Sequence, residues 1–570
     1  MENGVLCVAQ NPDSNRDKFI KLWKRTEMVR MSIAYLSAEV GFESRLHTYS
    51  GGLGVLAGDH IKSAADAGLD LIGCTLLYRE GYGRQKLDAQ GNQSETYGEI
   101  DPQEFLTDTG VEISLPLDGT ILYSKIWLYR IKGLPTYFLD TRHPDNSPEH
   151  AGLGNRLYGG DDSMRIRQEY LLGVGGIRAL QAMGHEITGL HLNEGHCTFA
   201  MLEMLHQGWS RDELSGRCLF TTHTPVPAGH DRFGWNEVEN VLKELLPDDA
   251  KQLVEDENTC SMSHLGIALA GQVNAVSNLN AYVASGMFPG THIHPITNGV
   301  HHETWTSLAI ANLFDEHLTG WRADPTTLAH AGRIPDEPLE MARNDSRSVL
   351  RDLVRAATGV ELEEHRLTIG FARRFATYKR ANLVFSDLER LRALGAGKIQ
   401  FVFAGKAHPR DEGGKQLIRD IFQGASQVEQ DIPVAFLEDY SMDTGLAMTS
   451  GVDIWLNNPI RPMEASGTSG MKAAMNGVPN CSILDGWWPE ACEHGVNGWA
   501  VGEGEDERDD ERDAKALYDI LEFEVLPAWE NGPEHWNDMM RASIATSARF
   551  TGARMISDYL RFYSNFTSLS

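Results

Sequence analysis

The second half of the chain alternates short apolar runs with amphipathic stretches, and this alternation constrains the fold more than any other feature. Five apolar runs are typical of buried strands: 367–371, 400–404, 434–437, 452–456 and 480–484. Between them lie stretches with helical spacing, near 381–393, 414–423, 441–449 and 469–476. Strands that alternate with helices in this way form a doubly wound parallel sheet. Ligands bind such sheets beyond the carboxyl ends of the strands, so function is expected in the loops that follow them.

The first half shows the same rhythm less regularly. A strand at 32–36, a glycine-rich turn at 50–54 and a helix at 55–68 predict the opening of a Rossmann-like unit. Further strands are expected at 69–77, 189–192, 218–221, 273–276 and 293–296, and helices at 170–183 and 198–207. We interpret residues 80–160 as hairpins inserted into this domain, because their apolar residues alternate. Residues 308–336 are mixed in character and predicted to be irregular.

A chain of 570 residues is too long for one core. We therefore expect an α/β protein of two Rossmann-like domains that face each other across a cleft. The N-terminal domain would span residues 1–305 and the C-terminal domain residues 306–570. This division allows the C-terminal helix to pack back on the N-terminal domain.

Composition restricts the class of function. The chain has 41% hydrophobic residues and 23% charged residues, with neither a signal peptide nor an apolar run long enough to cross a membrane. The net charge of −29 argues against nucleic acid as a partner. Seven scattered cysteines without metal-type spacing favour reduced thiols in the cytoplasm, and no metal site is expected. The acidic run at 503–513 is interpreted as a solvated loop.

The stretch 464–476, EASGTSGMKAAMN, combines an acid, small residues and an amine. Small residues at 465–470 allow backbone N–H groups to converge where a helix begins. Such groups have no partner inside the helix, so they bind anions. Glu464 stands at one end of this loop and Lys472 stands one turn into the helix. A glycine-rich turn with a surface lysine is the simpler interpretation, and spacing alone does not exclude it.

Two other loops after strands are basic in a strongly acidic protein. Residues 371–380 carry four cations and a tyrosine, and residues 404–408 carry a lysine and a histidine. Grouped cations without anions are costly in a partly buried site, so the cluster predicts bound phosphate. A solvated basic edge is the alternative.

The first half would contribute polar groups that also follow strands. These are Glu39, Asn193, Glu194, His196, His223 and Asn298. Each alone is more often a satisfied structural residue. Together they would suit a ligand rich in hydroxyl groups.

With these loops in place, the chain resembles the α-glucan phosphorylases, the family of glycogen, starch and maltodextrin phosphorylase. The stretch 464–476 matches their lysine motif, E-A-S/C-G-x-G/S-x-M-K-x-x-L/M-N, at every fixed position. Shorter matches follow in the same order at 50–54, 222–224, 297–299, 373–379, 404–407 and 436–440. The resemblance covers residues 32 to 490.

The resemblance implies a glycosyltransferase of the GT-B fold with pyridoxal 5′-phosphate bound covalently to Lys472. By position, the cofactor would be held by Arg373, Thr468, Ser469, Gly52 and Tyr440. The catalytic set would be Arg374 and Lys379, which hold inorganic phosphate, with Glu464 and His223, which contact glucose hydroxyls. The further substrate contacts would be Asn298, Tyr378, Ser466 and Gly467, and more loosely Glu39 and His196 near the glucan channel.

The implied reaction is reversible phosphorolysis of an α-1,4-glucan from its non-reducing end. It would yield α-D-glucose 1-phosphate with retention, and the phosphate group of the cofactor would shuttle the proton. A homodimer is expected from the resemblance. The chain is shorter than the regulated enzymes, so their allosteric sites are not carried over. Residues 193–196, NEGH, differ from the family's Asn-Asp-Thr-His, which leaves the channel and the preferred chain length open.

Three other functions are alternatives. A nucleotide-sugar glucan synthase shares the architecture, but its loop lacks a lysine placed like Lys472. A glucan-binding regulator would keep the fold without activity. An amino-acid enzyme with the same cofactor would need an acid for the pyridine nitrogen and an arginine for the substrate carboxylate.

Overall fold

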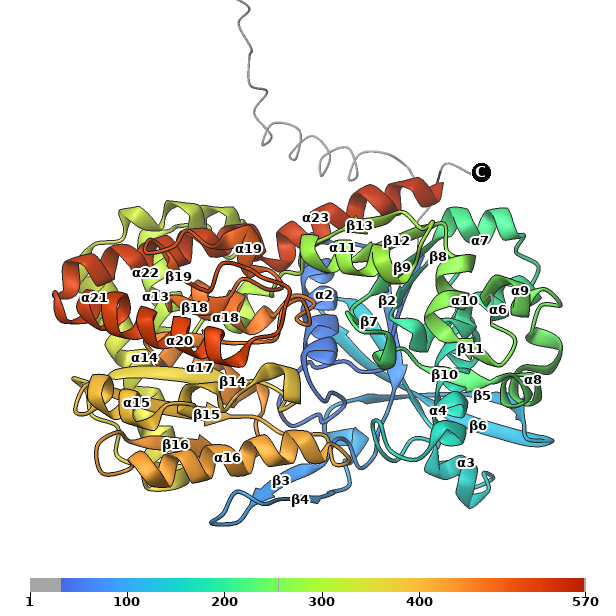
Figure 1. The fold of residues 1–570 in the computed structure, drawn as a ribbon. Helices are drawn as coiled ribbons and strands as arrows, with labels where there is room; N and C mark the ends of the chain where they lie inside the picture. The colour runs from blue at the N-terminus through green and yellow to red at the C-terminus, as the bar shows by residue number, and fades with distance from the viewer. Residues whose placement is uncertain (1–31, 255, 568–570) are drawn as a thin grey trace, which may run out of the picture.

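The computed structural model describes residues 32–254 and 256–567 (Figure 1). Its N-terminal half is built on a nine-stranded sheet in the order β13-β12-β9-β8-β1-β2-β7-β6-β5. The strands are β1 (Ser32–Ser37), β2 (Leu71–Leu76), β5 (Thr107–Leu117), β6 (Thr120–Ile131), β7 (Leu134–Asp140), β8 (Ile187–Asn193), β9 (Cys218–Thr222), β12 (Gln272–Ala275) and β13 (Ile293–Pro295). The strands from β13 to β7 pair in parallel, and β5 and β6 add an antiparallel edge.

The interpretation of residues 80–160 as inserted hairpins was only partly correct. β3 (Arg84–Leu87) and β4 (Gln93–Thr96) form a separate hairpin. β5, β6 and β7 instead extend the main sheet, because β7 pairs in parallel with β2. A second small ribbon joins β10 (Arg232–Gly234) and β11 (Thr259–Ser261).

The C-terminal half contains a six-stranded parallel sheet in the order β16-β15-β14-β17-β18-β19. Its strands are β14 (Leu367–Ala372), β15 (Ile399–Ala404), β16 (Val434–Leu437), β17 (Ile454–Asn457), β18 (Asn480–Ile483) and β19 (Gly498–Val501). Five were predicted and β19 was missed. Counted along the chain, the order is 3-2-1-4-5-6, which is that of dinucleotide-binding doubly wound folds. The order reverses between β14 and β17, so a ligand site is expected beyond the ends of these two strands.

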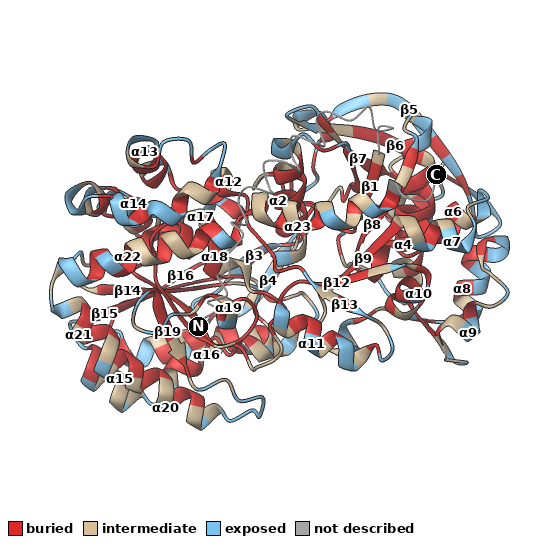
Figure 2. Ribbon diagram, turned by 90° about the horizontal axis from the view of Figure 1, so that it is seen from above, coloured by how far each residue is buried: buried red, intermediate tan, exposed pale blue. Residues whose placement is uncertain are grey.

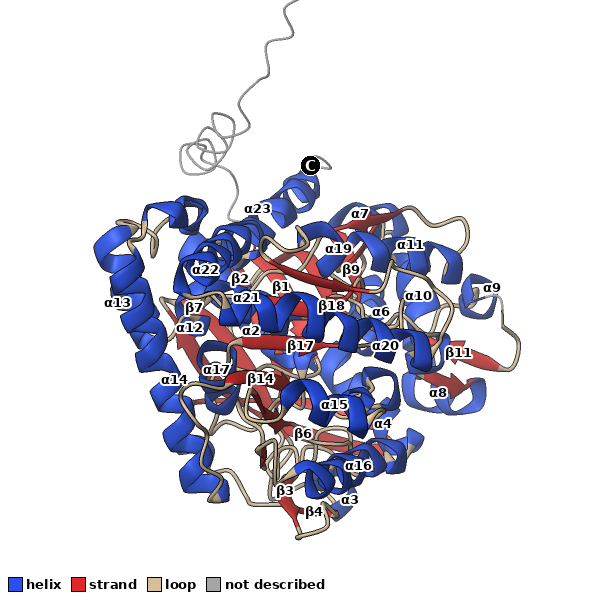
Figure 3. Cartoon of the chain, turned by 60° about the vertical axis from the view of Figure 1, so that its left-hand side comes forward, coloured by secondary structure: helices blue, strands red, loops and turns tan. Residues whose placement is uncertain are grey.

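Helices cover both sheets (Figure 3). In the N-terminal half they are α2 (Gly52–Ala67), α3 (Pro148–Gly152), α4 (Asp162–Tyr170), α5 (Gly176–Ala182), α6 (Phe199–His206), α7 (Arg211–Arg217), α8 (Trp235–Leu242), α9 (Ala250–Val254), α10 (Met262–Leu269) and α11 (Asn278–Met287). In the C-terminal half they are α12 (His302–Trp305), α13 (Leu308–His317), α14 (Asp336–Thr358), α15 (Leu388–Gly395), α16 (Glu412–Val428), α17 (Met442–Gly451), α18 (Thr468–Met475), α19 (Trp488–Ala491), α20 (Asp510–Ile520), α21 (Leu526–Glu530), α22 (Pro533–Ser547) and α23 (Gly552–Tyr563). Figure 2 shows buried strands and exposed outer faces of helices. Among the described residues, no helix has the length and apolar character needed to cross a bilayer.

The prediction that residues 308–336 are irregular was wrong. They form α13 and the 3₁₀ segment η6 (Pro325–Arg333), and lead into the long helix α14. The boundary between residues 305 and 306 stays a prediction.

The last helix, α23, returns to the N-terminal half and packs against α2 (Figure 1). Gly552 allows this approach, because a Cβ atom there would lie 2.0 Å from Ser63 Oγ. The Tyr563 hydroxyl lies 2.7 Å from His191 Nδ1 and 3.3 Å from His60 Nε2, and all three side chains are buried. Burial lowers the pKa of His60 to about 3, so this interface is held by neutral imidazoles.

Candidate active site

A cavity of about 630 Å³ is lined by loops from both halves, most of them at the carboxyl ends of strands. Of the site residues predicted from the sequence, Asn193 does not line it, and the others do: Glu39, Gly52, Glu194, His196, His223, Asn298, Arg373, Arg374, Tyr378, Lys379, Tyr440, Glu464, Ser466, Gly467, Thr468, Ser469 and Lys472. The fold therefore brings these predicted residues together in one cavity. The role of each residue stays a prediction.

Two helices begin at this cavity. α18 starts after Gly467, whose φ of 83° places it in the left-handed region that favours glycine. α2 starts at Gly52, and a Cβ atom on Gly51 or Gly52 would meet no atom within 4 Å. The first N–H groups of both helices lack intrahelical acceptors, and both helix dipoles add positive potential. The two ends suit anionic groups whose oxygens approach the backbone closely.

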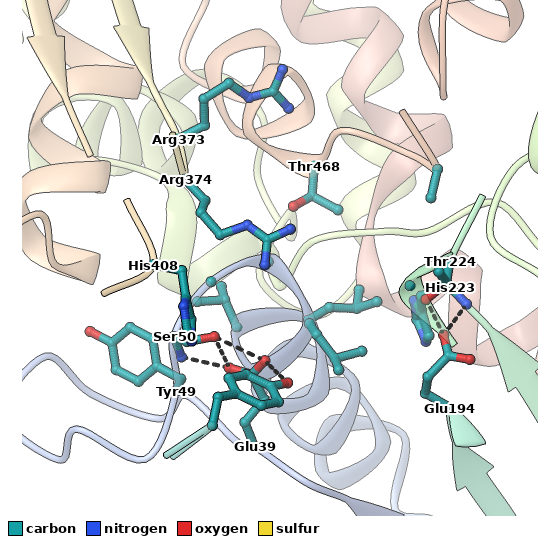
Figure 4. Close-up of a pocket in the computed structure, with 18 of the residues that line it drawn as sticks. Glu39, Tyr49, Ser50, Glu194, His223, Thr224, Arg373, Arg374, His408 and Thr468 are labelled. Atoms are coloured by element: carbon teal, nitrogen blue, oxygen red, sulfur yellow. Dashed lines mark hydrogen bonds between the residues drawn. The ribbon is translucent and has the colours of Figure 1, made fainter. Parts of the chain in front are cut away.

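Arg374 is a cation without a partner. Its side chain extends into the cavity between Thr468 and Ser50 (Figure 4). It makes no hydrogen bond or ion pair with any residue that the structure describes, whereas most other arginines are paired. A guanidinium presents five donors in a fixed fork that matches phosphate or carboxylate. This position is therefore the best candidate for binding an anion.

Arg373 and Lys379 are placed differently, because both bind Glu464. Arg373 Nη2 donates to Glu464 Oε2 at 2.7 Å, and Lys379 Nζ donates to the same oxygen. Burial raises the pKa of Glu464, but the charges of Arg373 and Lys379 outweigh burial and bring that pKa below its usual value. The backbone N–H of Glu464 donates to Asp485 at 2.9 Å, and burial together with the nearby Glu464 charge raises the pKa of Asp485 to about 7.

Lys472 is buried, and no carboxylate of the described residues binds its amine. Its Nζ atom lies 3.5 Å from the centre of the Trp305 ring. Burial lowers the pKa of Lys472 to about 8, and the nearby Asp59 opposes this effect. A lysine with this pKa has a substantial neutral fraction near neutral pH, and a neutral amine reacts with carbonyl groups. Together with the two helix ends, this amine fits a phosphorylated aldehyde such as pyridoxal 5′-phosphate.

Several polar atoms at the cavity wall are buried and have no hydrogen-bond partner among the described residues. They are Asn298 Oδ1, Ser466 Oγ, Glu194 Oε1 and His196 Nδ1. Glu194 also has a φ of 80°, an uncommon conformation for a residue other than glycine. Unpaired buried polar atoms and backbone strain cluster where a ligand completes the hydrogen bonding.

Glu39 and His223 already have partners. The Glu39 carboxylate accepts from Ser50 N at 2.5 Å and from the Tyr158 hydroxyl at 2.8 Å, so it holds the turn before α2. His223 Nε2 lies 2.6 Å from Asn193 Oδ1. Burial lowers the pKa of His223 to about 4, which keeps its ring neutral at pH 7.

Arg380 does not belong to the basic cluster predicted at 371–380. It does not line the cavity, and its guanidinium binds Asp510 at 2.9 Å and Asp513 at 2.8 Å. The interpretation of 503–513 as a solvated loop was therefore wrong for these two acids. They lie at the start of α20 and neutralise a buried cation.

Sequence reasoning missed the wall formed by Tyr158, Arg165 and Asp231. Arg165 lies 3.1 Å from Asp231, which lies 3.2 Å from His196 Nε2. These residues follow none of the predicted strands, so no local pattern could have found them. Lys406 and His408 line the cavity too, and the basic loop at 404–408 had pointed to them.

One group of three residues in the described chain has the spacing of metal ligands: Asp66, His301 and Glu303. Lys132 Nζ lies 2.6 Å from Asp66 and 3.3 Å from Glu303, so a cation already occupies the centre of this group. None of the three lines the cavity.

Comparisons with known proteins agree with the geometry. The family model for carbohydrate phosphorylases matches residues 233–497. The maltodextrin phosphorylase of Thermococcus litoralis is 40% identical over 93% of this chain and 70% of its own length. The glycogen phosphorylase of Mycobacterium tuberculosis is 38% identical over the same shares, and that of Aquifex aeolicus is 36% identical over 95% of this chain and 87% of its own length.

Proposed function

This chain belongs to the carbohydrate phosphorylase family, and on that premise we propose that it is an α-1,4-glucan phosphorylase with the GT-B fold. It would transfer the terminal glucose at the non-reducing end of glycogen, starch or maltodextrin to inorganic phosphate, reversibly and with retention, to give α-D-glucose 1-phosphate. The observation that carries the proposal is Arg374, an unpaired cation that shares one cavity with two helix N-termini and a buried lysine.

The binding of Glu39 and Glu464 by other residues favours phosphate over water as the attacking group. Glycosidases need one carboxyl group as acid and another as base or nucleophile. Here Glu464 is bound to two cations, and Glu39 is bound to Ser50 and Tyr158. Inorganic phosphate beside Arg374 would protonate the leaving glycosidic oxygen and then attack the anomeric carbon. Arg374 and Lys379 would stabilise its negative charge throughout.

The same cavity would hold pyridoxal 5′-phosphate. Lys472 would hold it covalently, with Arg373, Tyr440 and the backbone N–H groups of α2 and α18 around its phosphate. When bound, this group supplies a second phosphate that exchanges a proton with the substrate phosphate. The residues of the chain would hold the two anions close together by neutralising them.

The uncharged residues would orient the sugar. Asn298 and Ser466 have unpaired atoms that sugar hydroxyls would satisfy. Glu464 would accept a hydroxyl hydrogen bond, as a carboxylate kept ionised by Arg373 and Lys379. His223, Tyr378 and Gly467 would complete the glucose site, and His196 the glucan channel beyond it.

Product analysis tests the proposal. The protein, saturated with pyridoxal 5′-phosphate, is incubated with maltoheptaose with and without inorganic phosphate. We expect glucose 1-phosphate and maltohexaose only when phosphate is present. Release of free glucose would contradict phosphorolysis. A glucan product made only from a sugar nucleotide would indicate a synthase, and glucan binding without turnover would indicate a regulator.

We also propose that the protein is a cytoplasmic homodimer. Support comes from the family for the dimer, and from the scattered cysteines and ordinary polar composition for the compartment. Light scattering coupled to gel filtration measures the mass in solution, and a monomeric mass would contradict the dimer.

A further inference from the structure

The hairpin formed by β3 and β4 crosses from the N-terminal half to the C-terminal half. Its two strands pair only with each other, outside both main sheets. It lies beside α16 in both Figures 1 and 3. The contact is close, because a Cβ atom on Gly91 at the hairpin tip would lie 2.6 Å from the Phe422 ring of α16.

Gln93 both donates a hydrogen bond to one residue of the other half and accepts one from it. Its Nε2 atom donates to Ala407 O at 2.9 Å, and its Oε1 atom accepts from Ala407 N at 3.0 Å. The side-chain amide thus pairs with the backbone as a neighbouring strand would. Ala407 lies in the loop that follows β15.

Gln85 is fully buried and binds two loops at once. Its Nε2 atom donates to Gly405 O at 2.9 Å, and its Oε1 atom accepts from Asp439 N at 2.9 Å. The backbone N–H of Gln85 donates to Asp439 Oδ1 at 3.0 Å. Gln85 Nε2 also donates to Gln93 Oε1 at 2.8 Å, so the two glutamines act as one unit.

The loops held in this way line the cavity. Lys406 and His408 belong to the loop after β15, and Tyr440 belongs to the loop after β16. Both loops have left-handed residues at the points of contact, Gly405 with a φ of 139° and Asp439 with a φ of 54°. A non-glycine residue such as Asp439 persists in this conformation when surrounding contacts hold it there.

We propose that Gln85 and Gln93 are positioning residues: they fix the two loops that bring Lys406, His408 and Tyr440 to the cavity, and so keep the two halves closed around it. Attachment of the hairpin to the surface would not require Gln85 and Gln93. The exposed ion pair between Lys86 of the hairpin and Glu438 would serve for attachment alone, and exposed ion pairs contribute little to stability. Buried amide groups with matched partners in both directions are costly to break and define one geometry.

Hydrogen exchange measured by mass spectrometry tests the positioning directly, on the full chain. In the Gln93→Leu variant we expect the Ala407 amide to exchange about tenfold faster, because its half-buried acceptor is gone. In the Gln85→Leu variant the Asp439 amide should likewise exchange about tenfold faster. Lys86→Ala is the matched control on the same hairpin and should leave both amides unchanged.

Kinetics supply the second readout, and this part rests on the proposed function, whereas the exchange part does not. Gln93→Leu should raise the KM for phosphate about tenfold, with a smaller change in the KM for maltoheptaose. If the protein proves to have no phosphorylase activity, the exchange result still stands for or against the hairpin.

Unchanged exchange at Ala407 and Asp439 in both variants would overturn the proposal, as would an equal increase in Lys86→Ala. Faster exchange across the whole chain would also overturn it, since Gln93 would then support general stability. Should Gln93→Leu fail to fold, Gln93→Asn keeps the amide but is too short to reach Ala407. Faster exchange confined to the Ala407 region in Gln93→Asn supports the proposal. Exchange of the Ala407 amide at the parent rate overturns it.

Discussion

The amine of Lys472 rests on the face of Trp305, and the indole N–H of Trp305 donates to both carboxylate oxygens of Asp59 at 2.9 Å. The three residues come from α18, α12 and α2. The amine therefore contacts the face of an aromatic ring and not a carboxylate. Burial lowers its pKa to about 8, and the charge of Asp59, carried on the far side of the indole, limits the fall.

Capture of pyridoxal 5′-phosphate by the cofactor-stripped protein should depend on pH in a defined way. Only the neutral amine reacts, so the rate should rise with pH, reach half its maximum near pH 8 and level off above it. Asp59→Asn removes a charge that favours the protonated amine, so its midpoint should lie at lower pH. Absorbance in the pyridoxal band follows the reaction. Lys472→Met should capture nothing and exposed Lys515→Met should behave as the parent, whereas an unshifted midpoint in Asp59→Asn would refute the role of Asp59.

Replacing Arg374 should damage phosphate binding and spare stability. Arg374→Ala should lower kcat/KM for phosphate by about two to three orders of magnitude, because a donor to the reacting anion is lost. Arg374→Lys keeps the positive charge but loses the forked guanidinium donors. Its kcat/KM for phosphate should lie between the values of the parent and of Arg374→Ala. Since Arg374 makes no hydrogen bond or ion pair with the described residues, the melting temperature should not change. A phosphate KM that stays at the parent value in Arg374→Ala would place the phosphate elsewhere.

Arg380 should behave in the opposite manner. Its guanidinium binds Asp510 and Asp513 and donates to the carbonyl oxygens of Asn458 and Pro459. Arg380→Ala should cost about 1–3 kcal/mol of unfolding free energy, because the buried carbonyl oxygens of Asn458 and Pro459 lose their charged donor. Urea unfolding measures this cost. The exposed Arg508→Ala, which removes another partner of Asp510, should cost close to nothing. A stable Arg380→Ala protein with weakened phosphate binding would show that Arg380 serves the site after all.

Asp485 makes stability depend on pH. Its pKa in the folded protein is about 7, well above that of a free aspartate, so the folded state binds a proton more tightly than the unfolded state. The stabilisation from this proton is complete below about pH 4 and is lost as the pH rises through 7. Asp485→Asn keeps an oxygen for the Glu464 N–H without the charge, so its melting temperature should fall less than that of the parent between pH 5 and 8. Parallel melting curves for the two proteins would contradict the assignment.

The strands of the C-terminal sheet could be predicted because parallel strands buried on both faces leave continuous apolar runs. β19 was missed because it is short and follows a polar stretch. α14 was missed because most of its surface is charged and its buried stripe is narrow. The joining of β5–β7 to the main sheet depends on the pairing of β7 with β2, which alternation along β7 cannot reveal.

The convergence of the candidate residues was predictable for a related reason, since loops after parallel strands meet at one edge of the sheet. Which charges pair was not predictable. Arg373, Arg374 and Arg380 look alike in the sequence, yet one binds Glu464, one is unpaired and one binds acids in α20. The contact of Arg165 with Asp231 joins segments that no local pattern links.

The return of α23 to the N-terminal half has a consequence for biosynthesis. Ile33 and Tyr35 of the first strand share one apolar cluster with Met555 and Tyr559 of the last helix. At ribosomal speeds of roughly 5–20 residues per second, the first strand waits about half a minute or more for the helix that completes its core. During that interval an apolar face of the nascent N-terminal half stays uncovered. We therefore expect the N-terminal half to complete its native core after α23 has been translated.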